Sequence, residues 1–279
     1  MAKMEWILAK IEGAIGHLQI AKITTPQIIE VLQKEEALDN FETAGRMRTV
    51  AGEVFRYAIQ LGKCEHDPVD PTKGAIARPR VRHHFAILDA KMLSDLLKRI
   101  DEYSVRNVQV GTALKLMALS YPRPGELRKA DWGEFDLKHR IWNIPASRMK
   151  MRQDHFVPLS KQVVELLRIL YACTGPNGIV FPATGRANRC MSENTMNIAL
   201  RRMGIGSDVH SSHGFRDTAS TLLNASGRFS IDAIERSLAH QDKDAVRRAY
   251  ARGDAMKERG EMAQWWADYL DTLWKRHVS

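Results

Sequence analysis

The sequence has few cysteines, no apolar run long enough for a membrane and no secretory signal. Its three cysteines, Cys64, Cys173 and Cys190, lie far apart and lack the short paired spacings of a zinc site or a disulfide framework. No apolar stretch approaches the roughly 18 residues of a membrane helix, and the N-terminus lacks the order of basic, apolar and small residues that marks a signal peptide. These absences predict a soluble protein of the reducing cytoplasm with no membrane partner.

The sequence also lacks the signals of a bound cofactor. It has no Walker-type glycine loop and no cluster of carboxylates suited to magnesium. His210 and His213 have a helical spacing that could suit a metal, but no third ligand lies near them in the sequence. We therefore expect no cofactor and no metal site.

Positive charge is what the sequence has in excess. It contains 42 lysines and arginines against 33 aspartates and glutamates, which gives a net charge of +9. A basic surface neutralises phosphates, so this balance favours a nucleic-acid partner. An ordinary basic protein has the same balance, and the charge alone does not decide between the two.

The chain is long enough for two domains, and its first part, residues 1–64, predicts helices only. Thr25 followed by Pro26 indicates an N-cap with proline at the first helical position. A second helix is expected over residues 42–61, where apolar residues recur at helical spacing. Its other face carries three arginines, Arg46, Arg48 and Arg56. That face could grip DNA phosphates or could simply be solvated.

Residues 65–84 are rich in turn formers and then in positive charge, and they predict a basic linker between domains. The second domain, residues 85–279, is predicted to be mostly helical. It has one small antiparallel sheet, because Ile141–Pro145 and His155–Leu159 have the pattern of two strands joined by a polar turn. The fold class is therefore mainly α, with a helical first domain and a mixed second one.

Aromatic residues gather at the C-terminal end, over residues 261–273. Trp265, Trp266 and Tyr269 recur there at helical spacing. This helix could pack on its own domain, or it could dock on a neighbouring protomer if the aromatic side chains are exposed. The sequence alone leaves both alternatives open.

The residues that could perform chemistry lie in five segments. These segments are YPRPGEL at 121–127, SRMKMR at 147–152, HGFR at 213–216, LAH at 238–240 and the single Tyr250. Their order and spacing resemble the active site of the phage integrase family of tyrosine recombinases, in particular integrases of prophages and genomic islands. The resemblance covers nearly the whole chain and assigns six catalytic positions, which are Arg123, Lys150, His213, Arg216, His240 and Tyr250.

The resemblance implies a fold and a reaction. The fold is a helical core-binding (SAM-like) domain followed by a catalytic domain of the DNA breaking-rejoining type. The reaction is site-specific recombination, the integration and excision of a prophage or genomic island, through a covalent 3′-phosphotyrosyl intermediate. Double-stranded DNA is the implied partner. The protein is expected to bind it as a tetramer and to be a monomer in solution, and accessory DNA-bending or directionality factors are expected to assist. The implied location is the bacterial cytoplasm, on DNA.

The chemistry of these side chains agrees with that reaction. The pKa of a tyrosine hydroxyl is near 10, so only about one in a thousand is ionised at pH 7, and Tyr250 would need electrostatic help. Arg123 and Arg216 would clamp the phosphate with forked donors. Lys150 would protonate the leaving 5′ oxygen, with Arg152 as the fallback.

The two histidines would complete this site. His213 would accept or hold the tyrosine proton, and His240 would donate to a phosphate oxygen. Each position also has a structural alternative. Tyr250 could be a buried structural tyrosine, and Arg123 could be a surface arginine paired with Glu126.

Integrases of this type carry an arm-binding domain ahead of the core-binding domain, and the resemblance predicts that this sequence lacks it, either through truncation or in a shortened gene. Two alternative functions remain. One is DNA relaxation like that of a type IB topoisomerase, which shares the residue set. The other is a catalytically silent DNA-binding remnant, which would not require Tyr250.

Overall fold

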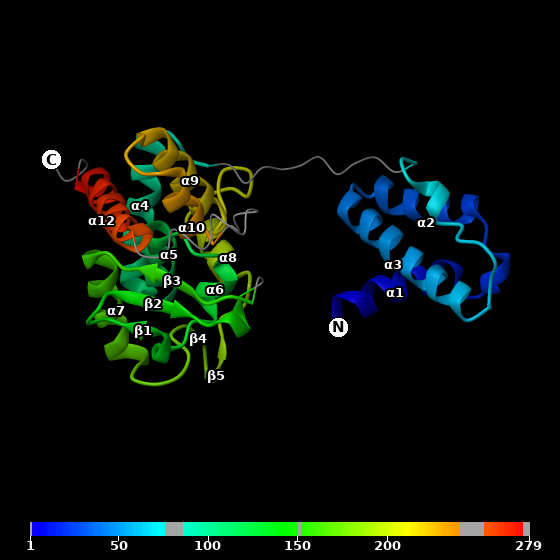
Figure 1. Cartoon of the computed structure of the whole chain (residues 1–279), viewed down its shortest axis with the longest axis horizontal. Helices are drawn as coiled ribbons and strands as arrows, with labels where there is room; N and C mark the ends of the chain where they lie inside the picture. The colour runs from blue at the N-terminus through cyan, green and yellow to red at the C-terminus, as the bar shows by residue number, and fades with distance from the viewer. Residues whose placement is uncertain (1, 76–85, 150–151, 240–253, 276–279) are drawn as a thin grey trace. The chain divides into compact units, whose positions relative to one another are not determined.

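The computed structural model describes residues 2–75, 86–149, 152–239 and 254–275 (Figure 1). The chain forms two compact units, Met1–Arg82 and His83–Ser279. Three of the predicted site residues, Lys150, His240 and Tyr250, lie outside the described residues. Within the described ranges, no helix is long and apolar enough to cross a membrane.

The first unit is a small helical bundle. Its helices are α1 (Ala2–Ile15), α2 (Thr25–Ala37) and α3 (Phe41–Gln60), with short 3-10 turns at Ile20–Lys22 and Asp70–Thr72. Helices α1 and α2 both pack against α3. The apolar stripe of each helix faces the others, so Ile28, Leu32 and Met47 are almost fully buried.

Helix α2 begins one residue differently from the sequence prediction. Thr24, and not Thr25, is the N-cap residue, and its backbone N–H donates to the Gln27 side chain at 2.9 Å. The Thr25 hydroxyl instead donates to the carbonyl of Pro68 at 3.0 Å. Thr24 followed by Gln27 three residues later is a capping-box pattern, which is the local signal for this cap.

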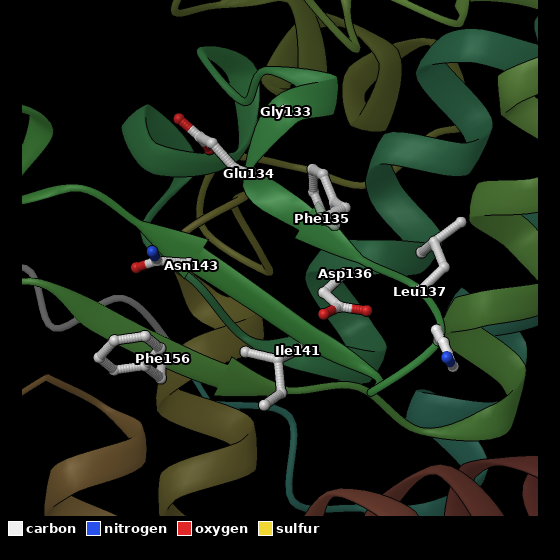
Figure 2. A pocket seen from close by; sticks show the side chains of 9 residues that line it. Gly133, Glu134, Phe135, Asp136, Leu137, Ile141, Asn143 and Phe156 are labelled. Carbon is white, nitrogen blue, oxygen red and sulfur yellow. The ribbon is translucent and has the colours of Figure 1, made fainter.

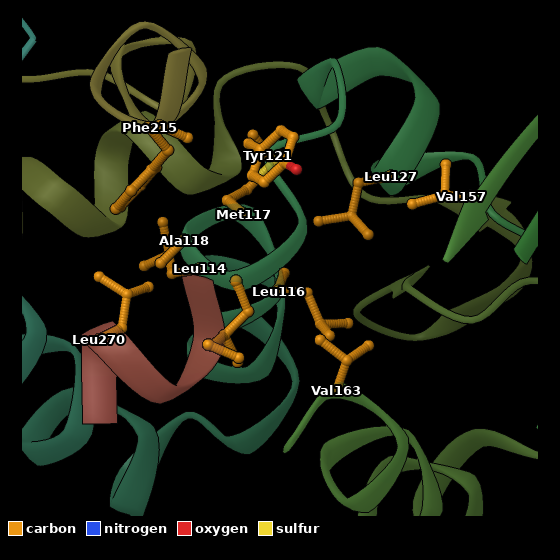
Figure 3. Close-up of a cluster of buried hydrophobic side chains, with 14 of the residues drawn as sticks. Leu114, Leu116, Met117, Ala118, Tyr121, Leu127, Val157, Val163, Phe215 and Leu270 are labelled. Carbon is orange, nitrogen blue, oxygen red and sulfur yellow. The ribbon is translucent and has the colours of Figure 1, made fainter. Parts of the chain in front are cut away.

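The second unit is built around helix α5 (Val108–Ser120). Residues on every side of this helix are buried, as its almost continuous apolar sequence requires. It is contacted by α4 (Ala90–Arg106), α6 (Pro124–Arg128), α7 (Lys161–Thr174), α8 (Thr195–Arg202), α9 (Gly214–Ser226) and α12 (Asp254–Lys275). Figure 3 shows Leu114, Met117 and Ala118 of α5 among side chains from neighbouring elements. The end of α5 is thus packed against several other elements of the unit.

The two predicted strands form an antiparallel pair. They are β2 (Ile141–Ile144) and β3 (His155–Pro158), with Ile144 opposite His155. A third strand, β1 (Phe135–Asp136), pairs with the other edge of β2, and the rings of Phe135 and Trp142 stack at 5.1 Å. A second sheet joins β4 (Pro182–Ala183) to β5 (Arg186–Cys190). Strands β1 and β4 have only two residues each, and β5 is rich in polar residues, so none of the three has an alternating apolar pattern.

A shallow pocket of about 700 Å³ lies on the three-stranded sheet (Figure 2). Side chains of all three strands line it, and Phe156 of β3 is 44% exposed there. The three predicted catalytic residues that the structure describes, Arg123, His213 and Arg216, are not among the residues that line it.

The C-terminal helix α12 packs inside its own unit, against α4, α5, α10 (Ile231–Ser237) and β3. Trp266 is buried, and its indole N–H donates to the carbonyl of Ala118 at 2.8 Å. Leu270 is fully buried on the same side of the helix. Of the two alternatives that the sequence left open, packing on the same domain is the one that the structure shows for this face.

Candidate active site

Arg123 is placed by the end of the central helix. Helix α5 stops at Tyr121, whose backbone is left-handed with φ of 43°, and the chain turns there into the short helix α6. Arg123 is the N-cap residue of α6, and Pro124 occupies the first helical position, where a missing N–H costs nothing. The left-handed turn at Tyr121 and the proline that starts α6 together set the position of Arg123.

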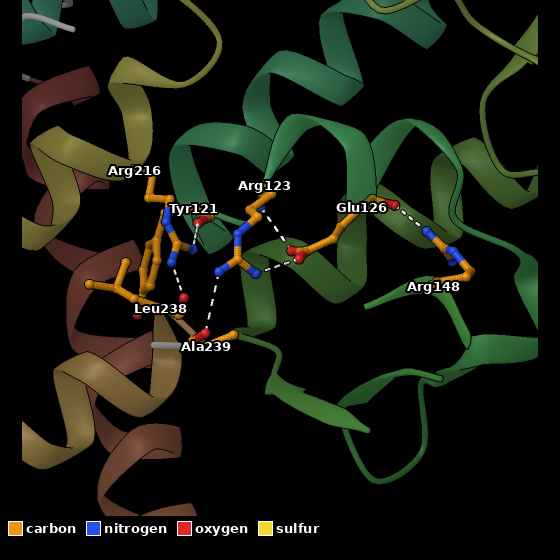
Figure 4. A network of polar contacts seen from close by, with 7 residues as sticks. All are labelled: Tyr121, Arg123, Glu126, Arg148, Arg216, Leu238 and Ala239. Carbon is orange, nitrogen blue, oxygen red and sulfur yellow. Dashed lines mark hydrogen bonds and ion pairs between the residues drawn. The ribbon is translucent and has the colours of Figure 1, made fainter. Parts of the chain in front are cut away.

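The carboxylate of Glu126 holds Arg123 at two points (Figure 4). It accepts the Arg123 backbone N–H at 3.0 Å and one guanidinium donor at 2.7 Å. The sequence had suggested this pairing with Glu126 as a purely structural role for Arg123. A guanidinium has five donors, and a second one reaches the carbonyl of Ala239 at 3.3 Å. The pairing therefore orients the side chain and leaves it able to bind another group.

Arg216 reaches the same place from a distant segment. It lies in the first turn of α9 and is 4% exposed. Its guanidinium donates to the carbonyl of Tyr121 at 3.3 Å and to that of Leu238 (Figure 4). Arg123 and Arg216 therefore meet at the consecutive carbonyls of Leu238 and Ala239, immediately before His240.

The spacing of the His-x-x-Arg segment has a simple structural origin. His213 directly precedes α9, and the backbone N–H of Arg216 donates to its carbonyl at 3.0 Å. The two residues consequently lie together at the start of one helix. The structure brings Arg123, Arg216 and the His213 segment to one end of the unit, while Lys150, His240 and Tyr250 lie outside the described residues.

Arg216 is a buried cation. Its hydrogen bonds within the described chain are to carbonyl oxygens. Burial and, to a lesser extent, the positive charge of Arg123 together lower the pKa of Arg216 to about 10, although the Glu126 and Asp217 carboxylates raise it. The side chain remains charged at neutral pH. Two guanidinium groups with one paired carboxylate between them make a site that an anion would stabilise.

His210 is an ordinary core histidine. It is 1% exposed, and its ring packs edge-on against Phe215 at 4.5 Å. Across the residues that the structure describes, no group of three histidine, cysteine or acidic side chains could hold a metal ion. The pairing of His210 with His213 as metal ligands therefore gains no third partner there.

Arg259 of α12 is a residue of this region that sequence reasoning missed. It is 7% exposed, and it donates to the Ser237 hydroxyl at 3.0 Å and to the carbonyl of Phe156. It therefore joins α12 to β3 and to the end of α10. The available signal was its helical spacing with the buried Met262 and Trp266, which places an arginine on the apolar face.

His155 of β3 is a second residue that the sequence analysis missed. Burial and, to a lesser extent, the positive charges of Arg259, Arg216 and Arg123 together lower the pKa of His155 from 6.5 to about 3. The imidazole is therefore neutral at physiological pH. It adds a polar side chain to the arginine cluster without adding charge.

This neutral histidine makes the folded state sensitive to acid. The unfolded chain binds a proton at His155 below about pH 6.5, whereas the folded chain does so only near pH 3, so stability falls as the pH drops through that interval. His155→Gln removes this term. We expect the unfolding free energy of wild type minus that of His155→Gln to fall as the pH is lowered from about 8 to about 5. Denaturant titrations at both pH values measure it, and an unchanged difference would contradict a His155 that stays neutral in the folded protein.

Comparison with solved structures identifies the fold of the chain. Lambda integrase (residues 75–356), solved as a dimer bound to a COC′ core site, superposes with a TM-score of 0.69, covering 86% of this chain and 87% of that one at 17% identity. At that identity the match establishes a shared fold. The fold is mostly helical with small antiparallel sheets, as the sequence predicted.

The sequence comparisons define the family. The model of the Phage integrase family matches residues 86–256, and that of the Phage integrase central domain matches residues 1–75. The integrase of Enterobacteria phage P4 is 36% identical over 95% of this chain and 63% of its own length. The prophage integrase IntA of Escherichia coli K12 is 35% identical over 92% of this chain and 61% of its own length. The chain belongs to the phage integrase family of tyrosine recombinases, and it spans less than two thirds of these two relatives.

Proposed function

We propose that the chain performs site-specific recombination of double-stranded DNA, in the integration and excision of a prophage or genomic island. The observation that carries this proposal is the meeting of Arg123 and Arg216 at the Leu238 and Ala239 carbonyls. Arginine donors of this kind suit the charge that develops on the nonbridging oxygens of a phosphodiester under attack. The next residue along the chain is His240, and Tyr250 follows ten residues later.

In this proposal Tyr250 attacks the scissile phosphorus. The bond from the tyrosine oxygen to phosphorus forms while the bond from phosphorus to the 5′ oxygen breaks. Lys150 gives the departing 5′ oxygen its proton, with Arg152 as the alternative donor, and His213 accepts or holds the tyrosine proton. His240 donates to a phosphate oxygen. The product is a 3′-phosphotyrosyl linkage.

The covalent linkage explains how the strand is rejoined. It preserves the free energy of the broken phosphodiester for attack by the 5′ hydroxyl of a second strand, so rejoining requires neither ATP nor a metal ion. Hydrolysis of the linkage would lose that free energy. The reaction is therefore expected to run in the presence of a chelator.

The two units have separate tasks in this proposal. Residues 1–64 form a core-type DNA-binding domain, residues 65–84 a basic linker, and residues 85–279 the catalytic domain. The relatives named above are integrases of a phage and a prophage, and lambda integrase has been solved as a tetramer bound to a Holliday junction. We infer a tetramer on DNA and a monomer in solution, aided by accessory DNA-bending or directionality factors.

Cleavage specificity separates this function from the alternatives. A recombinase should form a covalent adduct with DNA spanning its attachment site and none with a scrambled duplex of equal length. Relaxation of supercoiled plasmid without sequence preference would instead indicate a type IB topoisomerase. Binding to the attachment site with no adduct from the wild-type chain would indicate a silent DNA-binding remnant.

A further inference from the structure

Arg148 links two segments of the candidate site that are far apart in sequence. It lies at the end of the 3-10 turn Ala146–Arg148, where the chain leaves β2 toward β3. One side of its guanidinium forms an ion pair with Glu134, and the other donates to the carbonyl of Glu126 (Figure 4). The side chains of Arg148 and Glu134 are only 18% and 10% exposed.

The acceptors of Arg148 are themselves firmly held. The second carboxylate oxygen of Glu134 accepts the indole N–H of Trp142 at 2.9 Å, and Trp142 is 1% exposed in the core. Glu126 belongs to the short helix α6, whose last carbonyls have no partner further along the helix. An arginine that donates to such a carbonyl stabilises the C-terminal end of the helix. Arg148 is therefore fixed at both ends of its guanidinium.

Arg123 does not depend on this link. Among the described residues, its side chain contacts the Glu126 carboxylate three residues away and the carbonyl of Ala239, and neither contact involves Arg148. Among the described residues, the start of this turn is also held by Met149, which is 7% exposed in the core, and by the backbone bond from the Met149 N–H to the Ala146 carbonyl. Loss of the Arg148 side chain would remove the hydrogen bond that ties the start of the β2–β3 turn to α6, and it would leave the hold on Arg123 intact.

We propose that Arg148 is a positioning residue that fixes the start of the β2–β3 turn to the helix bearing Arg123, and so serves the proton transfer to the leaving 5′ oxygen. Lys150 follows two residues later. The inference rests on the proposed function, in which this turn supplies the general acid. It assigns Arg148 to one step of the reaction, the departure of the 5′ oxygen, and not to phosphate binding.

The test compares two leaving groups in single-turnover cleavage. An ordinary suicide substrate requires a proton on its 5′ oxygen, whereas a 5′-bridging phosphorothiolate releases a thiolate, which is stable without a proton because thiol pKa values are near 8.5. Arg148→Met should slow cleavage of the ordinary substrate by about 10²-fold, the lower end of what general acid catalysis contributes. It should cleave the phosphorothiolate at nearly the wild-type rate.

Two further variants keep the test decisive. Arg148→Lys retains the charge beside Glu134 but cannot span both acceptors, so it should show the same pattern if Arg148→Met folds poorly. Arg168→Met, which removes an exposed arginine from α7, should cleave both substrates as wild type does. Equal defects on both substrates in the Arg148 variants would overturn the inference, since the residue would then act on the phosphate or on folding.

Lys150→Ala separates this inference from the proposed function. If the phosphorothiolate restores the cleavage rate of both Lys150→Ala and the Arg148 variants, the turn supplies the proton through Lys150. If it restores the rate of the Arg148 variants only, the inference about Arg148 stands with a different general acid, and the assignment of Lys150 fails. A wild-type chain that forms no adduct with either substrate would overturn the proposed function and this role of Arg148 with it.

Discussion

Tyr250→Phe is expected to bind attachment-site DNA as tightly as the wild type and to form no covalent adduct with it. The change removes the single oxygen that attacks phosphorus and leaves the ring in place. The tyrosine that lies beside the arginines, Tyr121, cannot replace it. Tyr121 is 4% exposed, and burial raises its pKa to about 12, so its hydroxyl is neither accessible nor readily ionised.

The measurement pairs a suicide substrate on a denaturing gel with a binding titration on the same DNA. Tyr171→Phe is the matched control, because it removes one hydroxyl from a 44% exposed side chain and keeps the ring that packs on Trp132. The control should form adduct at the wild-type rate. An adduct that survives in Tyr250→Phe would mean that another residue is the nucleophile.

Arg216→Lys should lower the rate of strand cleavage by about 10²- to 10³-fold, the usual effect of losing one preorganised donor at a developing charge. Lysine keeps a positive charge but lacks the fork that reaches the Tyr121 and Leu238 carbonyls and a phosphate together. The site is also buried enough to lower the pKa of Arg216 to about 10. A lysine there starts from a lower pKa than arginine and would lose charge more readily.

Single-turnover cleavage with the protein in excess separates this loss from weaker DNA binding. Arg99→Lys is a suitable control, since Arg99 also donates to a backbone carbonyl, that of Met203, at 2.8 Å. Arg99→Lys should cleave DNA at nearly the wild-type rate. Cleavage by Arg216→Lys within tenfold of wild type would show that Arg216 is not a phosphate clamp.

Sequence reasoning located what depends on local order. The His-x-x-Arg segment was found from its residue pattern, and in the structure His213 is the N-cap of α9 while Arg216 lies in its first turn. The pairing of Arg123 with Glu126 followed from a separation of three residues. Both are short-range features, so the pattern of residue types was enough to predict them.

The contacts that sequence reasoning missed join distant segments. Arg259 reaches Phe156 across 103 residues, and Arg148 reaches Glu126 across 22. Nothing in the local sequence of either arginine specifies its partner, because packing of α12 and of the sheet brings them together. The same reason applies to Trp266, whose helix could have packed inward or outward until the position of the Ala118 carbonyl was known.

The most direct test of the tyrosine mechanism is to trap wild-type protein on a suicide substrate in EDTA, digest the adduct and identify the linked peptide and DNA end. The prediction is a peptide containing Tyr250, joined through its phenolic oxygen to a 3′ phosphate, with a free 5′ hydroxyl on the departed strand. DNA that is bound but not trapped, or a linkage through another residue or to a 5′ end, would contradict it.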